Sequence, residues 1–151
     1  MGFTAFKNNY IARVNGEGFA TSADSADFIV SEYLGSFNVP GLTITAPAAP
    51  LVEAVNAVFN AGDSPTVLET KLTTALSVYW LTAVYTGGYT TLLTGPTGGG
   101  TPTTGNIPEQ AESVEDFVDG LVSMFEDHIS GITFSHPTSP PILGSVLLIV
   151  P

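Results

Sequence analysis

Apolar side chains recur at a helical spacing in four separate segments of the chain. In each segment they fall at positions i, i+3, i+4 and i+7, which is the spacing that lines one face of an α-helix. Thr21-Ser22 and Ser64-Pro65 precede two of the segments and are typical N-terminal capping signals. The pattern predicts four amphipathic helices, at residues 22–35, 48–60, 65–86 and 108–131.

The last of these segments has the clearest pattern. Pro108 stands at its start and Gly131 at its end, as expected for the two ends of a helix. Acidic residues occupy the other faces. The apolar stripe is unbroken and consists of Val114, Phe117, Val118, Leu121, Val122, Phe125 and Ile129. In the preceding segment the stripe widens toward Trp80, the only tryptophan, which we expect to anchor the core.

The two ends of the chain have no clear helical period. Residues 1–20 carry four aromatic side chains among small polar residues, and we interpret them as an arm, extended or irregularly helical, that docks by its aromatics. Residues 132–151 are interpreted as an extended tail. Within the tail, residues 142–150 are apolar and rich in β-branched side chains, which favours a strand or a buried tail.

A long segment rich in Gly, Pro and Thr separates the last two predicted helices. Residues 94–105, TGPTGGGTPTTG, contain no charged, aromatic or large aliphatic side chain. They could form a phosphate-binding loop, a linker between domains, or an arm that orders against a partner. Residues 89–93 could form one arm of a hairpin. We expect residues 87–107 to project from the bundle as a loop that is mobile in an isolated subunit.

These observations together predict the fold class. We expect a mainly α protein, a small bundle of about four amphipathic helices with a long Gly/Pro/Thr loop and extended N- and C-terminal arms. The sequence also allows a short β-hairpin or strand. A length of 151 residues suggests one domain. Its parts are the arm at 1–20, three helices within 21–86, the loop at 87–107, the last helix at 108–131 and the tail at 132–151.

Composition narrows the classes of function. Only 11% of the residues are charged, against about 25% in ordinary soluble domains, so the surface suits a protein packed against neighbours. The net charge of −11 argues against binding nucleic acid or an anionic membrane. No apolar run reaches the roughly 20 residues that span a bilayer. The chain has no cysteine, which excludes a disulfide framework and thiolate chemistry.

No pattern of residues points to catalysis. No Lys or Arg follows Lys71, so the glycine-rich loop lacks the lysine of a phosphate-binding loop. The spacing of His128 and His136 matches no common metal site, and we expect His128 in a solvated face or an assembly contact. The acid pairs of the helices are interpreted as exposed: Asp24 with Asp27, and Asp116 with Asp119. We therefore expect no enzyme activity, no cofactor, no metal, and neither catalytic nor binding site residues.

A structural role in an assembly accounts for all of these features. The segments ITAPAAP, LTGPTGGGTPTTG and PTSPPILGSVLLIVP around short amphipathic helices resemble, in composition, small structural proteins of tailed-bacteriophage virions. The resemblance implies a head-decoration, head–tail connector or tail-completion protein. Such a protein is made in the host cytoplasm and packs with copies of itself and other virion proteins. The alternative is a helical bundle that binds an apolar small molecule beside Tyr79, Trp80 and Tyr85.

Overall fold

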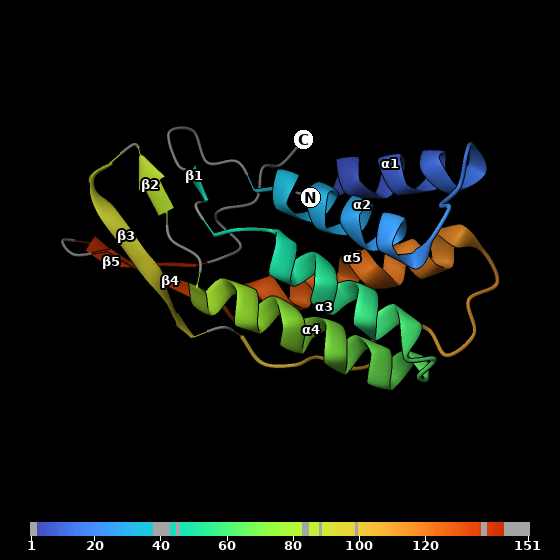
Figure 1. Ribbon diagram of the computed structural model, residues 1–151. Helices are drawn as coiled ribbons and strands as arrows, with labels where there is room; N and C mark the ends of the chain where they lie inside the picture. The colour runs from blue at the N-terminus through green and yellow to red at the C-terminus, as the bar shows by residue number, and fades with distance from the viewer. Residues whose placement is uncertain are drawn as a thin grey trace.

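Figure 1 shows the computed structural model of the chain. It describes residues 3–37, 43–44, 46–82, 85–87, 89–98, 100–136 and 139–143. Five helices lie within these residues and form a bundle (Figure 1), so the prediction of a mainly α fold is confirmed. They are α1 (Thr4–Asn15), α2 (Ser22–Gly35), α3 (Ala49–Asn60), α4 (Pro65–Thr82) and α5 (Val114–Ser130).

The fifth helix, α1, lies where an N-terminal arm was expected. Phe3, at its N-cap, and Phe6 and Tyr10 within it are all buried, because positions i, i+3 and i+7 share one face of a helix. Arg13 then ties α1 to α2 by donating to Gly18 O at 2.7 Å and to Asp24 Oδ2 at 3.1 Å. Of the two expected forms of this segment, the helix that docks by its aromatics is the one observed, and the extended form is not.

Helices α2 and α5 begin at side-chain caps. Thr21 Oγ1 accepts a hydrogen bond from Asp24 N, and Ser113 Oγ accepts one from Asp116 N, each at 3.1 Å. Each cap satisfies a backbone donor that has no partner within its own helix. The start of α2 agrees with the prediction, whereas α5 begins after Ser113 instead of at Pro108. The predicted start at Pro108 was wrong because residues 106–108 cross α5 and pack against Gly120.

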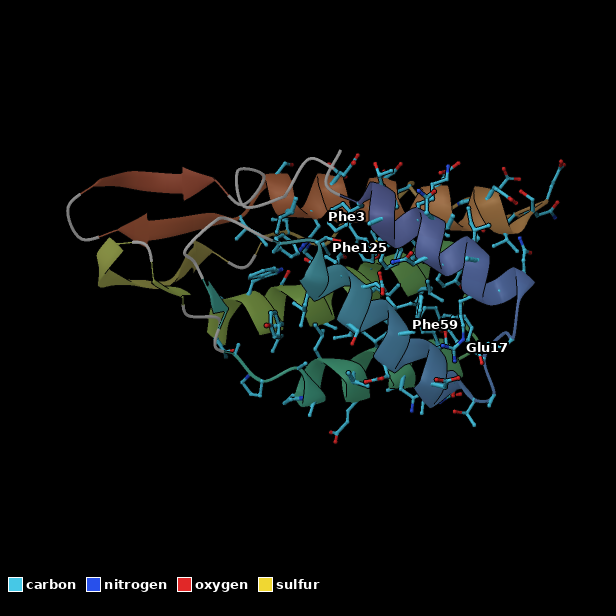
Figure 2. The ribbon with its side chains drawn as sticks, turned by 90° about the horizontal axis from the view of Figure 1, so that it is seen from above. Phe3, Glu17, Phe59 and Phe125 are labelled. Carbon is cyan, nitrogen blue, oxygen red and sulfur yellow. The ribbon has the colours of Figure 1, made fainter. Side chains whose placement is uncertain are left out.

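A cluster of aromatic rings fills the core where α1, α2, α4 and α5 meet. Phe3 lies 5.3 Å from Phe125, ring centre to ring centre (Figure 2). Tyr33 lies 4.7 Å from Phe125 and accepts a hydrogen bond from Trp80 Nε1 at 2.8 Å. Trp80 is fully buried, as predicted for a core anchor. Edge-to-face and offset contacts between such rings stabilise a core beyond the area they bury.

A five-stranded antiparallel sheet adjoins the bundle at the end where α4 and α5 finish (Figure 1). Its strands pair in chain order, and Thr43 faces Thr86 while Thr94 faces Ser135. The strands are β1 (Thr43–Ile44), β2 (Tyr85–Gly87), β3 (Tyr89–Gly98), β4 (Thr133–His136) and β5 (Ser139–Leu143). Helix α4 ends at Thr82, before the predicted end at residue 86, because β2 already begins at Tyr85. Residues 142–150 were expected to form a strand or a buried tail. Ile142 and Leu143 belong to β5, and residues 144–150 lie outside the described part.

The expected projecting loop has a different structure. Residues 89–98 form β3, and the chain after Gly100 lies against α4 through hydrogen bonds to Thr73 and Glu69. Ile107 is buried. The loop does not project at these residues because its backbone N–H groups find acceptors on α4, which a composition of Gly, Pro and Thr does not reveal. Mobility of residues 94–105 in an isolated subunit stays a prediction.

Candidate functional site

A surface groove lies between the start of α3 and the end of α4. It encloses about 390 Å³. One wall consists of Pro47, Pro50, Leu51 and Ala54, and the other of Ala75, Val78, Tyr79 and Thr82. Burial raises the pKa of Tyr79 to about 12, so its phenol stays neutral at any physiological pH. The groove therefore has no charged side chain and offers almost only apolar contacts.

The aromatic residues expected to line a pocket separate in the structure. Tyr79 lines the groove and donates a long hydrogen bond to Ala46 O at 3.4 Å. Trp80 lies in the core instead, bonded to Tyr33. The side chain of Tyr85 lies outside what the structure describes. A second, much smaller cavity beside Tyr33 and Phe125 has a volume of about 10 Å³, which holds no more than one water molecule.

The outer face of α4 carries three exposed apolar side chains among the exposed polar residues Thr66, Lys71, Thr74 and Thr82. Val78 is 61% exposed, Leu81 57% and Val67 41%, and these are the large exposed apolar residues among those whose side chains the structure describes. Single exposed apolar residues are ordinary. Val78 and Leu81, however, are neighbours on the last turns of α4 and lie beside the apolar groove, so this end of α4 is the part of the described surface that most resembles an interface.

Charge is distributed unevenly along the molecule. All 3 basic and all 14 acidic residues lie outside three uncharged stretches, residues 33–52, 72–108 and 128–151. The five strands belong entirely to these stretches, and so do the end of α4 and the start of α3. We call this part of the molecule the uncharged end: the sheet, residues 46–52 and residues 72–82.

The opposite end of the bundle is acidic. At this end α1 and α3 finish and α4 begins (Figure 1). The segment that leads into α5 also lies at this end. Glu17 marks this end in Figure 2, far from the strands. Two of the basic residues lie here too, Arg13 paired with Asp24 and Lys71 with Asp63. We call this part the acidic end, and its acids are Glu17, Asp24, Asp63, Glu109, Glu112, Glu115 and Asp116.

One carboxylate, Glu69 on α4, is fully buried. Its Oε1 accepts from Asn106 N and Ile107 N, both at 2.8 Å. Its Oε2 accepts from Thr103 Oγ1 at 2.7 Å and Asn106 Nδ2 at 2.9 Å. Burial alone would raise the pKa of Glu69, but these hydrogen bonds outweigh it and hold the pKa below its ordinary value. Four donors satisfy the carboxylate, so it fastens the segment after Gly100 to α4 and leaves little capacity for a ligand.

The structure brings together Ser77 and His128, which the sequence analysis did not connect. Ser77 Oγ lies 2.8 Å from His128 Nε2 and donates to Thr73 O at 2.8 Å. Ser77 Oγ also lies 3.3 Å from Gly100 O. The contact between Ser77 and His128 joins α4 to α5.

The prediction of a solvated His128 was wrong, because its side chain is only 1% exposed. It follows Leu121 by seven residues and so falls on the buried stripe of α5. That spacing was visible in the sequence. Gly100 packs directly on the ring, and a Cβ added there would lie 2.9 Å from Nε2.

The acid pairs have local structural roles. Asp24 is half-buried and accepts from Arg13, while Asp116 Oδ2 accepts from Glu112 N at 3.1 Å near the start of α5. Asp119 pairs with Lys7 at the surface. The described part of the chain contains no group of three His, Asp or Glu side chains that could hold a metal ion. The side chain of His136 lies outside that part.

Comparison with known protein families, with curated protein sequences and with solved structures finds no match to the chain. Within the described residues, none of the helices combines the length and apolar character required to cross a bilayer. The most distinctive features of the described structure are thus the groove, the uncharged end and the buried Glu69.

Proposed function

We propose that the chain is a non-enzymatic structural subunit that acts by packing against copies of itself and against other proteins of a larger assembly. We further propose that this assembly is the virion of a tailed bacteriophage, in which the subunit serves in head decoration, head–tail connection or tail completion. It would be made in the host cytoplasm and incorporated into the particle.

The observation that carries this proposal is the exposed apolar side of α4. Val78 and Leu81 are more than half exposed at the end of the helix. They stand next to an uncharged groove of about 390 Å³, in a chain where only 11% of residues are charged. Covering an exposed apolar surface is favourable by about 25 cal/mol per Å², and an assembly partner supplies that cover. The virion as the setting is supported by the resemblance in composition.

Purified particles of the phage that encodes the chain provide the test. We expect peptides of the chain in extensively washed particles, at a constant ratio to the major structural proteins, by quantitative mass spectrometry. Disrupting its gene should yield particles that lack a component or fail to complete. Presence in the lysate combined with absence from washed particles, and normal particles after gene disruption, would contradict the proposal.

The groove itself favours a second candidate function, binding of an apolar small molecule. A volume of about 390 Å³ falls in the range of small-molecule sites, roughly 300–1,000 Å³. A neutral dye, Nile red, would report binding by its fluorescence. Ala54→Phe would fill the groove and abolish the signal if the groove is the site, while Ala57→Phe on the exposed face of α3 serves as the matched control. Equal signals from the two variants would exclude the groove.

A further inference from the structure

We infer that the groove between α3 and α4 binds a neutral, largely apolar molecule that carries a hydrogen-bond acceptor such as a ketone oxygen, and that the Tyr79 hydroxyl donates to this acceptor. This inference rests on the second candidate function and names the class of ligand and the residue that recognises it. The apolar body of the ligand lies between the two helices, and its acceptor lies where Tyr79 reaches the opposite wall.

The walls of the groove suit the apolar body of a small molecule. Helices α3 and α4 lie side by side (Figure 1), and the lining of the groove extends from the buried Leu51 to the exposed Val78. Ala54 and Ala75, one on each helix, are half-buried, and their small side chains leave the space of about 390 Å³ open. Water in such a groove finds few hydrogen-bond partners, so an apolar body gains free energy by displacing it.

The hydroxyl of Tyr79 lies where the two walls meet. It donates to Ala46 O, on the residue before Pro47, over a distance of 3.4 Å. Ordinary O–H···O hydrogen bonds are about 2.5–3.0 Å long, so this one is weak, and a ligand oxygen at an ordinary distance is the better acceptor. Because burial raises the pKa of Tyr79 to about 12, the hydroxyl keeps its proton and acts as a donor.

The other hydroxyl of the groove, on Thr82, is already committed. Its Oγ1 donates to Tyr79 O at 2.8 Å. Pro47 and Pro50, which line the opposite wall, have no N–H to donate. Among the described residues that line the groove, Tyr79 therefore has the side-chain donor that a ligand can recruit, and the ligand has to bring the acceptor.

The charges around the groove select a neutral ligand. None of the described residues that line it is charged. Glu53, which is exposed and next to Ala54 in the sequence, is an acid, and the one base of α4, Lys71, pairs with Asp63. A carboxylate in the groove would lose its hydration without gaining a cation, in a chain of net charge −11, which is costly. An ammonium group has no lone pair to accept from Tyr79.

Probes with the same carbon skeleton separate these contributions. Acetophenone carries a ketone, ethylbenzene has no such acceptor, and phenylacetate carries a negative charge. Titration of the isotope-labelled full chain, followed by NMR at the amides of Ala54 and Ala75, gives a dissociation constant for each probe. We expect Tyr79→Phe to raise the dissociation constant of acetophenone about 3–10-fold and that of ethylbenzene less than about twofold. Tyr10→Phe, the matched change of a buried tyrosine in α1, should alter neither.

The charge of the ligand provides an independent readout. Wild type should bind phenylacetate at least about tenfold more weakly than acetophenone. Equal affinity for these two probes, or a Tyr79→Phe variant that loses as much affinity for ethylbenzene as for acetophenone, would overturn the inference. So would a wild-type chain that binds none of the probes. Circular dichroism checks that Tyr79→Phe is folded, and Tyr79→Leu takes its place if it is not.

The Nile red experiment tests the groove separately. Dye binding that Ala54→Phe abolishes, without any distinction among the probes, would support the second candidate function and overturn only the inference about the class of ligand.

Discussion

The backbone nitrogen of Ile107 donates to the carboxylate of Glu69 at 2.8 Å, across 38 residues of sequence. With Thr103 and Asn106, it encloses a charge that is completely shielded from solvent. A buried carboxylate costs several kcal/mol unless its lone pairs are satisfied, and here four donors satisfy them. This contact decides the path of the chain between β3 and α5.

Removing the Glu69 carboxylate should therefore loosen that path. We expect Glu69→Ala to lower the free energy of unfolding by about 3 kcal/mol, because buried donors lose their acceptor. Chemical denaturation followed by Trp80 fluorescence measures the change. Glu109→Gln is the control, since Glu109 is exposed and accepts a hydrogen bond from Thr66 Oγ1 at the surface. Its effect should stay within about 0.5 kcal/mol. Equal effects of the two variants would show that the Glu69 contacts contribute nothing particular.

The same carboxylate should make stability depend on pH. Hydrogen bonds hold the pKa of Glu69 below its ordinary value of 4.5. A group whose pKa is lower in the folded state stabilises the fold above its unfolded pKa and loses that contribution as pH falls through the folded pKa. The difference in stability between wild type and Glu69→Gln should thus be constant above pH 4.5 and shrink below it. Denaturation at a series of pH values tests this, and a difference that grows on acidification would contradict it.

Gly120 allows the segment before α5 to cross that helix closely. A Cβ at Gly120 would lie 2.9 Å from Pro108 Cδ and 3.0 Å from Asn106 O, closer than atoms can pack. We expect Gly120→Ala to destabilise the fold by about 1–3 kcal/mol, although alanine favours helix by about 1 kcal/mol. Gly35, in α2, has nothing within 4 Å of the same position. Gly35→Ala should be neutral or stabilising, and thermal denaturation of the two variants should shift in opposite directions or by clearly different amounts.

Phe3 tests whether the N-terminal segment belongs to the core. Its ring contacts Tyr33 at 5.8 Å and Phe125 at 5.3 Å and is fully buried. Phe3→Ala should cost about 3–5 kcal/mol, as is usual for a buried phenylalanine. Val67→Ala removes a 41% exposed side chain and should cost less than about 1 kcal/mol. A Phe3→Ala variant as stable as wild type would restore the view of this segment as an extended arm.

Sequence patterns identified the elements that carry their own signals. The stripe of α5 and the Thr21 cap of α2 are local, and both were predicted. The start of α5 was predicted wrongly, because Pro108 and Ser113 are equally good signals for the start of a helix. The choice between them depends on the contact of residues 106–108 with Gly120 and Glu69, which joins parts of the chain that are distant in sequence.

The candidate site was harder to predict for the same reason. Glu69 resembles any acid on an amphipathic helix, and two of its four donors are backbone N–H groups, which leave no mark in a sequence. The groove depends on how α3 packs on α4 and therefore on tertiary structure. The uncharged stretches were readable from the sequence, but their meeting in one sheet required the pairing of Thr43 with Thr86 and of Thr94 with Ser135.

Those pairings also fix when the sheet can form. Strands β2 and β3, and likewise β4 and β5, are hairpins that can form locally, but β1 joins β2 and β3 joins β4 across about forty residues each. Long-range pairing forms late in folding because the intervening chain has to be ordered first. The uncharged sheet is therefore completed only after α3, α4 and α5 have folded. In a nascent chain the helices that carry the charged residues therefore form first, and the sheet is the last part of the molecule to be completed.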